Sequence, residues 1–175
     1  MEYQLLTHIN KNLKTTDIKG KPYVEVNERI RGFRMMFPNG FIKTELIQME
    51  NGIVTVMAKV GYYADVDFRE IVLATGLAQE SQSSSFINKT SYVENCETSA
   101  VGRALGMLGI GIDTSIASAE EVENAINGQK QLEELIKQIK EKVEERRWPK
   151  MFETYKVKGF EELTIRQAED ILRRV

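Results

Sequence analysis

FIKTELIQMENGIVTVMAKVGYYADVDFREIVLATGLAQ, residues 41 to 79, decides the fold, because its apolar side chains recur at about every second residue. Three runs follow this period, and they cover residues 41–49, 53–63 and 68–79. Asn51-Gly52 separates the first two runs, and this pair is the one that a tight hairpin turn prefers. A longer turn, residues 61–68, precedes the third run. The stretch therefore predicts an antiparallel meander of three strands.

Residues with helical spacing flank this meander on both sides. Before it, one apolar stripe consists of Val26, Ile30, Phe33 and Phe37. A shorter stripe nearer the N-terminus consists of Leu5, Leu6, Ile9 and Leu13, and the turn-like residues 17–22 follow it. After the meander, residues 92–110 project as a helix with one apolar side. The sequence therefore predicts an α+β fold whose core is helix, three-stranded antiparallel meander and helix.

The predicted helix at residues 92–110 has a second face that carries glycines in place of larger side chains. Gly102, Gly106 and Gly109 lie there, and a glycine costs a helix about 1 kcal/mol relative to alanine. We expect these three residues to serve close packing, in which a backbone of protein or nucleic acid approaches the helix. Arg103 lies at the edge of this face and is the only charge between Glu97 and Asp113.

The composition changes after Asn127-Gly128, where only helical spacing remains. We expect a helix at residues 118–126 with Ser118 as its N-cap, and then a separate long amphipathic helix that Trp148-Pro149 interrupts. Thr164 and Gln167 predict a capping box for a last helix. The prediction divides the chain into a core with its N-terminal helix, residues 1–128, and a small helical C-terminal module, residues 129–175.

Composition excludes several classes of protein. One cysteine and one histidine exclude a disulfide framework and a Cys/His zinc site. The absence of a signal peptide and of any apolar run of about 18 residues predicts a cytoplasmic protein. The net charge of −2 hides a basic segment, residues 11–43, which carries +5. Such a segment on an otherwise acidic chain indicates either a nucleic-acid surface or ordinary solvated helices.

Catalytic constellations are weak, so we expect no enzyme, no cofactor and no metal. Cys96 as a nucleophile needs a base, and His8 is the sole histidine. Asp65, Asp67 and Glu70 leave open a metal-dependent nuclease, although a solvated hairpin turn explains them more simply.

The order of the elements and two motifs resemble the single-strand annealing proteins, which include the eukaryotic Rad-fifty-two annealing domain and the phage Sak and Erf types. YVEVNERIRGFRMMFPNG, residues 23–40, resembles the first helix of that family, and GRALGMLG, residues 102–109, resembles the basic helix after its sheet. Residues 84–126 are similar to annealing proteins of phages in Gram-positive hosts. The resemblance covers roughly residues 20–127.

This resemblance implies a phage-encoded recombination protein that acts in the cytoplasm of a bacterial host. It implies ATP-independent binding of single-stranded DNA and annealing of complementary strands by a ring or helical homo-oligomer. Arg103 falls on the DNA-contacting basic position of the family. Physical reasoning adds six further DNA-binding candidates, which are Lys19, Lys21, Arg31, Arg34, Lys43 and Lys89. Tyr62, Tyr63 and Phe86 are candidates for base stacking.

Two alternatives to annealing stay open, namely a nonspecific single-strand-binding or adaptor protein and the metal nuclease above. For the C-terminal module we expect a protein partner, either the host single-strand-binding protein or a phage exonuclease. The residues that suit an acidic peptide with an apolar end are Lys156, Lys158, Phe160, Arg166, Arg173 and Arg174. The alternative is that the module packs on the core or on a neighbouring subunit.

Overall fold

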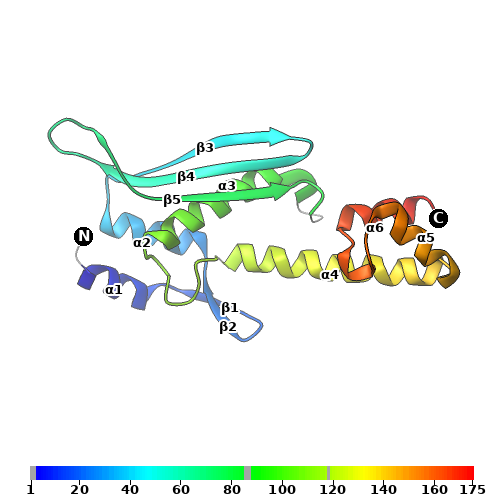
Figure 1. Ribbon diagram of the computed structural model, residues 1–175. Coiled ribbons are helices and arrows are strands. Elements are labelled where there is room, and N and C mark those ends of the chain that lie inside the picture. The colour runs from blue at the N-terminus through cyan, green and yellow to red at the C-terminus, as the bar shows by residue number, and fades with distance from the viewer. Residues whose placement is uncertain (1–2, 85–87, 118) are drawn as a thin grey trace.

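The computed structural model describes residues 3–84, 88–117 and 119–175. Figure 1 shows an elongated molecule, in which a sheet with helices on one face forms the body and a small group of helices lies beyond one end of the sheet. Phe86 and Ser118, predicted to stack on bases and to cap a helix, lie outside the described residues. Among the described helices, none is long and apolar enough to cross a membrane.

The N-terminal segment contains more regular structure than predicted. Helix α1, Tyr3–Asn12, leads into a hairpin of β1, Thr15–Ile18, and β2, Lys21–Val24. Lys19 and Gly20 form its turn with φ angles of 53° and 79°, and the Asp17 carboxylate accepts a hydrogen bond from the Gly20 N–H. The sequence predicted only a turn here, because two four-residue strands are too short to show a period.

The meander is confirmed, and it makes the protein an α+β fold with a three-stranded antiparallel sheet flanked by helices. Its strands are β3, Phe41–Glu50, β4, Ile53–Tyr63, and β5, Glu70–Ser81, in the order β3-β4-β5. Asn51 and Gly52 make the first turn with φ angles of 53° and 73°, the left-handed conformation that a two-residue hairpin needs.

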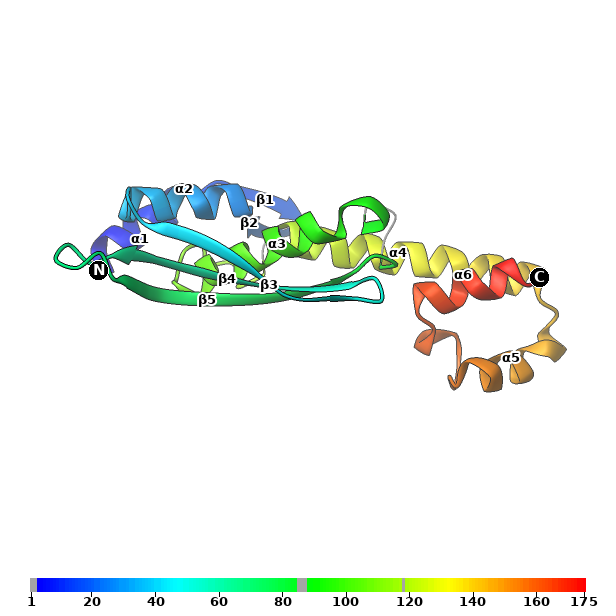
Figure 2. The ribbon, with the colours of Figure 1, turned by 90° about the horizontal axis from the view of Figure 1, so that it is seen from above.

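Two helices lie on one side of this sheet (Figure 1), and Figure 2 shows the same arrangement from above. Helix α2, Val26–Met36, precedes the sheet, and helix α3, Asn88–Met107, follows it and packs on β4 and β5. The core between them includes Phe33, Val54, Val56, Ala58, Val60 and Leu105. Gly76 on β5 allows the close approach of α3, because a Cβ there would lie 2.3 Å from the Ala100 carbonyl oxygen.

The C-terminal module is joined to the body by one continuous helix. Helix α4, Ala119–Lys142, passes through Asn127-Gly128, so the two separate helices predicted on either side of that pair are one. A 3₁₀ turn, Glu145–Arg147, helix α5, Trp148–Tyr155, a second 3₁₀ turn, Phe160–Glu162, and helix α6, Ile165–Arg173, complete the module. The Thr164 and Gln167 capping box of α6 is confirmed.

The module has its own apolar core. Its buried residues are Ile139, Val143, Leu163, Ala168 and Ile171. This cluster shares no member with the core under the sheet. The boundary proposed at residue 128 stays a prediction, because α4 belongs to both parts of the molecule.

Candidate nucleic-acid interface

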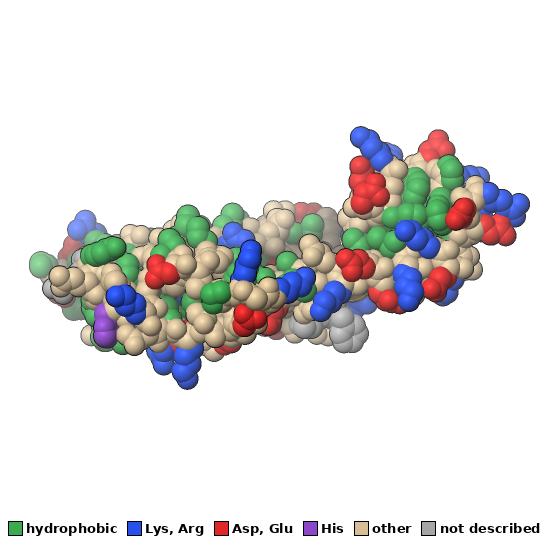
Figure 3. Space-filling view, turned by 90° about the horizontal axis from the view of Figure 1, so that it is seen from below, with side chains coloured by type: hydrophobic (Ala, Val, Ile, Leu, Met, Phe, Trp, Pro, Cys, Tyr) green, Lys and Arg blue, Asp and Glu red, His purple; other side chains and the backbone are tan. Residues whose placement is uncertain are grey.

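The seven predicted DNA-binding cations lie on four different parts of the fold and do not line one groove. Lys19 and Lys21 lie at the β1–β2 hairpin, Arg31 and Arg34 on α2, Lys43 on β3, and Lys89 and Arg103 on α3. Figure 3 shows Lys and Arg side chains distributed along the length of the body. The basic segment of the sequence is therefore spread over the surface.

Most of these cations already have an anionic partner in the protein. Arg31 pairs with Glu28 at 2.7 Å, Lys89 with Glu169 at 3.3 Å and Arg103 with Glu121 at 2.7 Å. Lys43 pairs with Glu70, and the hydrogen bond to that carboxylate raises the pKa of Lys43. Within the described part of the chain, Lys19, Lys21 and Arg34 form no ion pair. Exposed pairs contribute only about 0–1 kcal/mol, so a phosphate can displace such a carboxylate.

The bare face of α3 receives a side chain of the protein itself. The Arg29 guanidinium is fully buried, and it donates to the carbonyls of Gly102, Ser115, Ile116 and Ala117 at 2.6–3.2 Å. A Cβ on Gly106 would lie 2.8 Å from Arg29 Nη1. Gly109, predicted on the same helical face, lies past the end of α3 with a φ of 103°, so it is a turn residue.

Sequence reasoning missed Arg29, although one signal was present. Arg29 is three residues after Val26 and four before Phe33, so it shares the buried stripe of α2. Burial lowers the pKa of its guanidinium, and the nearby Glu120 and Glu121 carboxylates oppose that shift. Glu120 also accepts a hydrogen bond from the Val26 N–H at 3.0 Å, which caps α2. Arg29 thus holds residues 115–117 and α3 against α2.

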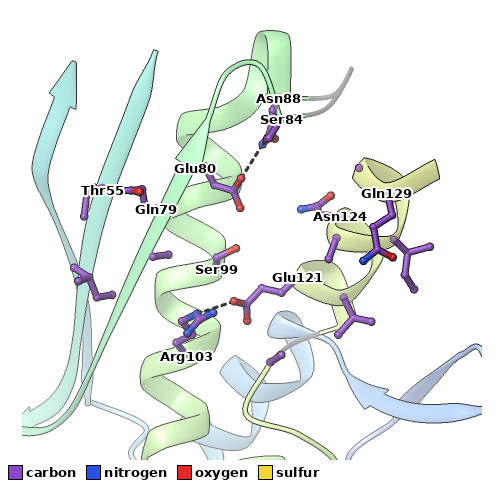
Figure 4. A pocket seen from close by; sticks show the side chains of 17 residues that line it. Thr55, Gln79, Glu80, Ser84, Asn88, Ser99, Arg103, Glu121, Asn124 and Gln129 are labelled. Carbon is purple, nitrogen blue, oxygen red and sulfur yellow. Dashed lines mark hydrogen bonds and ion pairs between the residues drawn. The ribbon is translucent and has the colours of Figure 1, made fainter. Parts of the chain in front are cut away.

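Arg103 borders a groove of about 800 Å³ between β5, α3 and the first turns of α4. Figure 4 shows its guanidinium pointing to Glu121, which comes from α4 on the other side. Glu80 lies in the same groove, where burial raises the pKa of its carboxyl and Asn88 donates to it at 2.8 Å. Two carboxylates and one guanidinium make a poor site for a polyanion, so Arg103 binds a phosphate only if Glu121 releases it.

A second cavity, of about 550 Å³, is lined by aromatic rings and by the acidic side chain of Asp65, at the other end of the sheet. Phe37 stacks on Tyr62 with ring centroids 5.9 Å apart, and Tyr63 and Phe68 also line the cavity. Tyr62 and Tyr63 are each more than one third exposed and Phe68 is 78% exposed. We call this cavity with its rings the aromatic end.

Two of the predicted cations lie next to the aromatic end, each in contact with a residue that lines it. Arg34 donates a hydrogen bond to the Gly40 carbonyl, and Gly40 lines the cavity. Lys43 Nζ lies 5.7 Å from the centre of the Tyr63 ring. Flat rings beside cations are the groups that bind the bases and phosphates of nucleic acids. Phe37 and Phe68 were not predicted here, because they come from two turns far apart in the sequence.

The acidic turn between β4 and β5 gives no sign of a metal site. Asp67 pairs with Arg69 at 3.7 Å and Glu70 with Lys43. Over residues 3–84, 88–117 and 119–175, no group of three His, Cys, Asp or Glu side chains is placed to hold a metal ion.

Comparison with known families corrects the resemblance given above. Residues 30–108 match a family model described as Slr1353 N-terminal dsRNA-binding domain-like. The match begins within α2, includes the three strands and ends one residue after α3. A comparison with curated proteins finds no match. The resemblance to the single-strand annealing family is therefore wrong. Both families have the element order helix, three-stranded meander, helix, so this order does not distinguish one from the other.

Proposed function

We propose that this protein binds nucleic acid through the sugar–phosphate backbone, with little preference for sequence. The observation that carries the proposal is that residues 30–108, the stretch similar to a double-stranded RNA-binding-like domain, coincide with the α2-β3-β4-β5-α3 unit. Backbone contacts position a nucleic acid without reading its sequence.

A second part of the proposal concerns the kind of nucleic acid that the protein prefers. The aromatic end offers exposed rings, and stacking on rings requires unpaired bases. Recognition of duplex RNA instead uses shape and contacts across successive minor grooves, without stacking. We therefore propose single-stranded DNA as the substrate and the pairing of complementary strands, without ATP, as the activity.

Annealing by several copies needs surfaces through which the protein associates with itself. Strands β3 and β5 are the two edges of the sheet, and over the described residues neither pairs with a further strand. Exposed apolar side chains lie on these edge strands, namely Leu46, Ile47 and Met49 on β3 and Val72, Leu73 and Leu77 on β5. Unpaired edges of this kind favour sheet-to-sheet association. We propose a homo-oligomer on this ground.

Fluorescence anisotropy with four labelled probes of one sequence tests the binding. The probes are single-stranded DNA, single-stranded RNA, duplex DNA and duplex RNA. We expect binding of single strands to weaken with salt at a log–log slope of about −0.7 for each phosphate contact. Binding that is indifferent to salt, or absent for all four probes, contradicts the proposal.

An annealing assay tests the proposed pairing of complementary single strands. Two complementary labelled oligonucleotides are mixed without nucleotide, with and without the protein, and their pairing is followed over time. We expect faster pairing with the protein. A protein that binds single strands and leaves the pairing rate unchanged is an adaptor, and tighter binding of duplex RNA than of any single strand contradicts the preference for unpaired bases.

A further inference from the structure

The C-terminal module contains a cavity of its own that the proposed function does not use. Its volume is about 370 Å³, within the range of about 300–1,000 Å³ that is typical of ligand pockets. The floor is apolar and consists of Val143, Met151, Tyr155 and Ile171. The rim carries four cations, which are Arg146, Arg147, Lys150 and Arg174. We call this site the module pocket.

The sequence of the 3₁₀ turn and α5 places two rim cations beside each other. Arg147 precedes the first residue of α5, and Lys150 lies three residues later on the same side of the helix. Met151 follows Arg147 by four residues, so this apolar side chain lies on the same side of the helix, and it lines the same pocket. Figure 3 shows hydrophobic side chains gathered on the module with charged side chains around them.

The rim has more positive charge than its own carboxylates neutralise. Arg146 pairs with Glu144 at 2.5 Å, and Arg174 pairs with Asp170 at 2.9 Å. Asp170 also accepts a hydrogen bond from the Tyr155 hydroxyl at 2.6 Å. Arg147 and Lys150 form no ion pair with any residue that the structure describes. The positive charge of the module pocket that no carboxylate of the described residues pairs with therefore lies at Arg147 and Lys150, at the start of α5.

Charge and shape together favour one class of ligand. Arginine and lysine above an apolar floor complement a chain that carries carboxylates next to an apolar side chain. A nucleic-acid strand fits less well, because the floor is mainly aliphatic and therefore suits an apolar side chain better than a stacked base. We propose that the module pocket binds an acidic peptide segment of another protein, with one apolar side chain on the floor and carboxylates paired to Arg147 and Lys150.

The site differs from the basic surface that composition indicated. Of the residues expected to grip an acidic peptide, Arg174 alone lines the module pocket, whereas Lys156, Lys158, Phe160, Arg166 and Arg173 do not. Phe160 packs instead between Trp148 and Phe152, with both pairs of ring centroids 5.0 Å apart. This difference supplies a matched control, because Lys158 and Arg166 are exposed cations of the same module.

Titration of the full chain with a labelled acidic peptide tests the proposal. The probe is a synthetic eight-residue peptide with four Asp or Glu residues followed by a leucine. A second peptide, with Asn and Gln in place of the acids, and a labelled single-stranded DNA complete the set. We expect the acidic peptide to bind, and the double variant Arg147→Ala with Lys150→Ala to weaken that binding about tenfold. The control double variant, Lys158→Ala with Arg166→Ala, removes the same charge and should change the binding less than about twofold.

Several results would overturn the proposal. An equal loss of peptide affinity in both double variants would show that binding depends only on the net charge of the module. Equal binding of the neutral peptide would remove the role of the rim, and failure of the acidic peptide to bind would remove the site. If loss of Arg147 and Lys150 weakens only the DNA probe, the pocket belongs to a nucleic-acid surface. Circular dichroism of each variant checks that its helix content, and therefore its fold, is unchanged.

Discussion

The body and the C-terminal module use their charged side chains in different ways. In the body, Arg29 is buried against four carbonyls, and Arg31, Lys43 and Arg103 each pair with a carboxylate. In the module, Arg147 and Lys150 face a cavity, and among the residues described no carboxylate pairs with either. The more basic stretch of sequence therefore has much of its charge neutralised internally. A count of charges along a chain does not locate the charge that is available to a ligand.

The largest effect should come from the buried cation of the body. Arg29→Met removes the guanidinium that donates to the carbonyls of Gly102, Ser115, Ile116 and Ala117, and a buried carbonyl that loses its donor costs about 1–3 kcal/mol. We expect a loss of about 3 kcal/mol or more in the free energy of unfolding, measured by urea denaturation of the full chain. Arg31→Met, which breaks only an exposed pair, should cost less than about 1 kcal/mol. Similar losses in the two variants would show that Arg29 has no special structural role.

A smaller effect should follow from filling the space between β5 and α3. In Gly76→Ala the new Cβ meets the Ala100 carbonyl oxygen at 2.3 Å and the Ala104 nitrogen at 2.4 Å, and both belong to backbone. We expect a loss of about 1–3 kcal/mol in thermal or urea unfolding, because α3 must move away from the sheet.

Gly128→Ala is the matched control at the junction of body and module. The nearest atom to its new Cβ is the Ser84 carbonyl oxygen at 3.5 Å, an ordinary contact, and Gly128 lies inside α4. Alanine should stabilise the helix there by up to about 1 kcal/mol. Destabilisation by Gly128→Ala would mean that α4 is not continuous through the junction, and a neutral Gly76→Ala would mean that α3 does not approach the sheet closely.

The smallest effect concerns the groove beside Arg103. Burial raises the pKa of the Glu80 carboxyl, so the unfolded chain ionises at lower pH than the folded chain does. The stability that Glu80 contributes therefore falls as pH rises from its ordinary pKa of about 4.3 through the raised value. Glu80→Gln keeps an acceptor for Asn88 and should be the more stable protein at pH 7, by less than about 1 kcal/mol, with the difference shrinking toward pH 4. A difference that grows on acidification would contradict this assignment.

The sequence predicted the elements that have a strong local pattern. Alternation between residues 41 and 79 and the Asn51-Gly52 turn located the sheet, and the Thr164 and Gln167 capping box located the start of α6. Asn127-Gly128 was misleading, because a helix tolerates one glycine when its neighbours pack well.

The site was harder to predict, since its contacts join distant parts of the chain. Arg103 meets Glu121 on another helix, Phe37 meets Tyr62 across a turn and a strand, and Arg29 reaches residues 115–117. No local pattern predicts such pairs. The order of elements alone also suggested the wrong family, because the order helix, meander, helix occurs in more than one family.

The most direct test of the account is the salt dependence of single-stranded DNA binding when the cations of the aromatic end are removed. Arg34→Ala with Lys43→Ala should weaken binding and reduce the magnitude of the log–log slope by about 1.4, which corresponds to two lost phosphate contacts. Lys130→Ala with Lys137→Ala removes two exposed cations of α4 and should leave the slope unchanged within error. An unchanged slope in the first variant, or an equal change in both, would contradict the claim that the aromatic end of the body holds the strand.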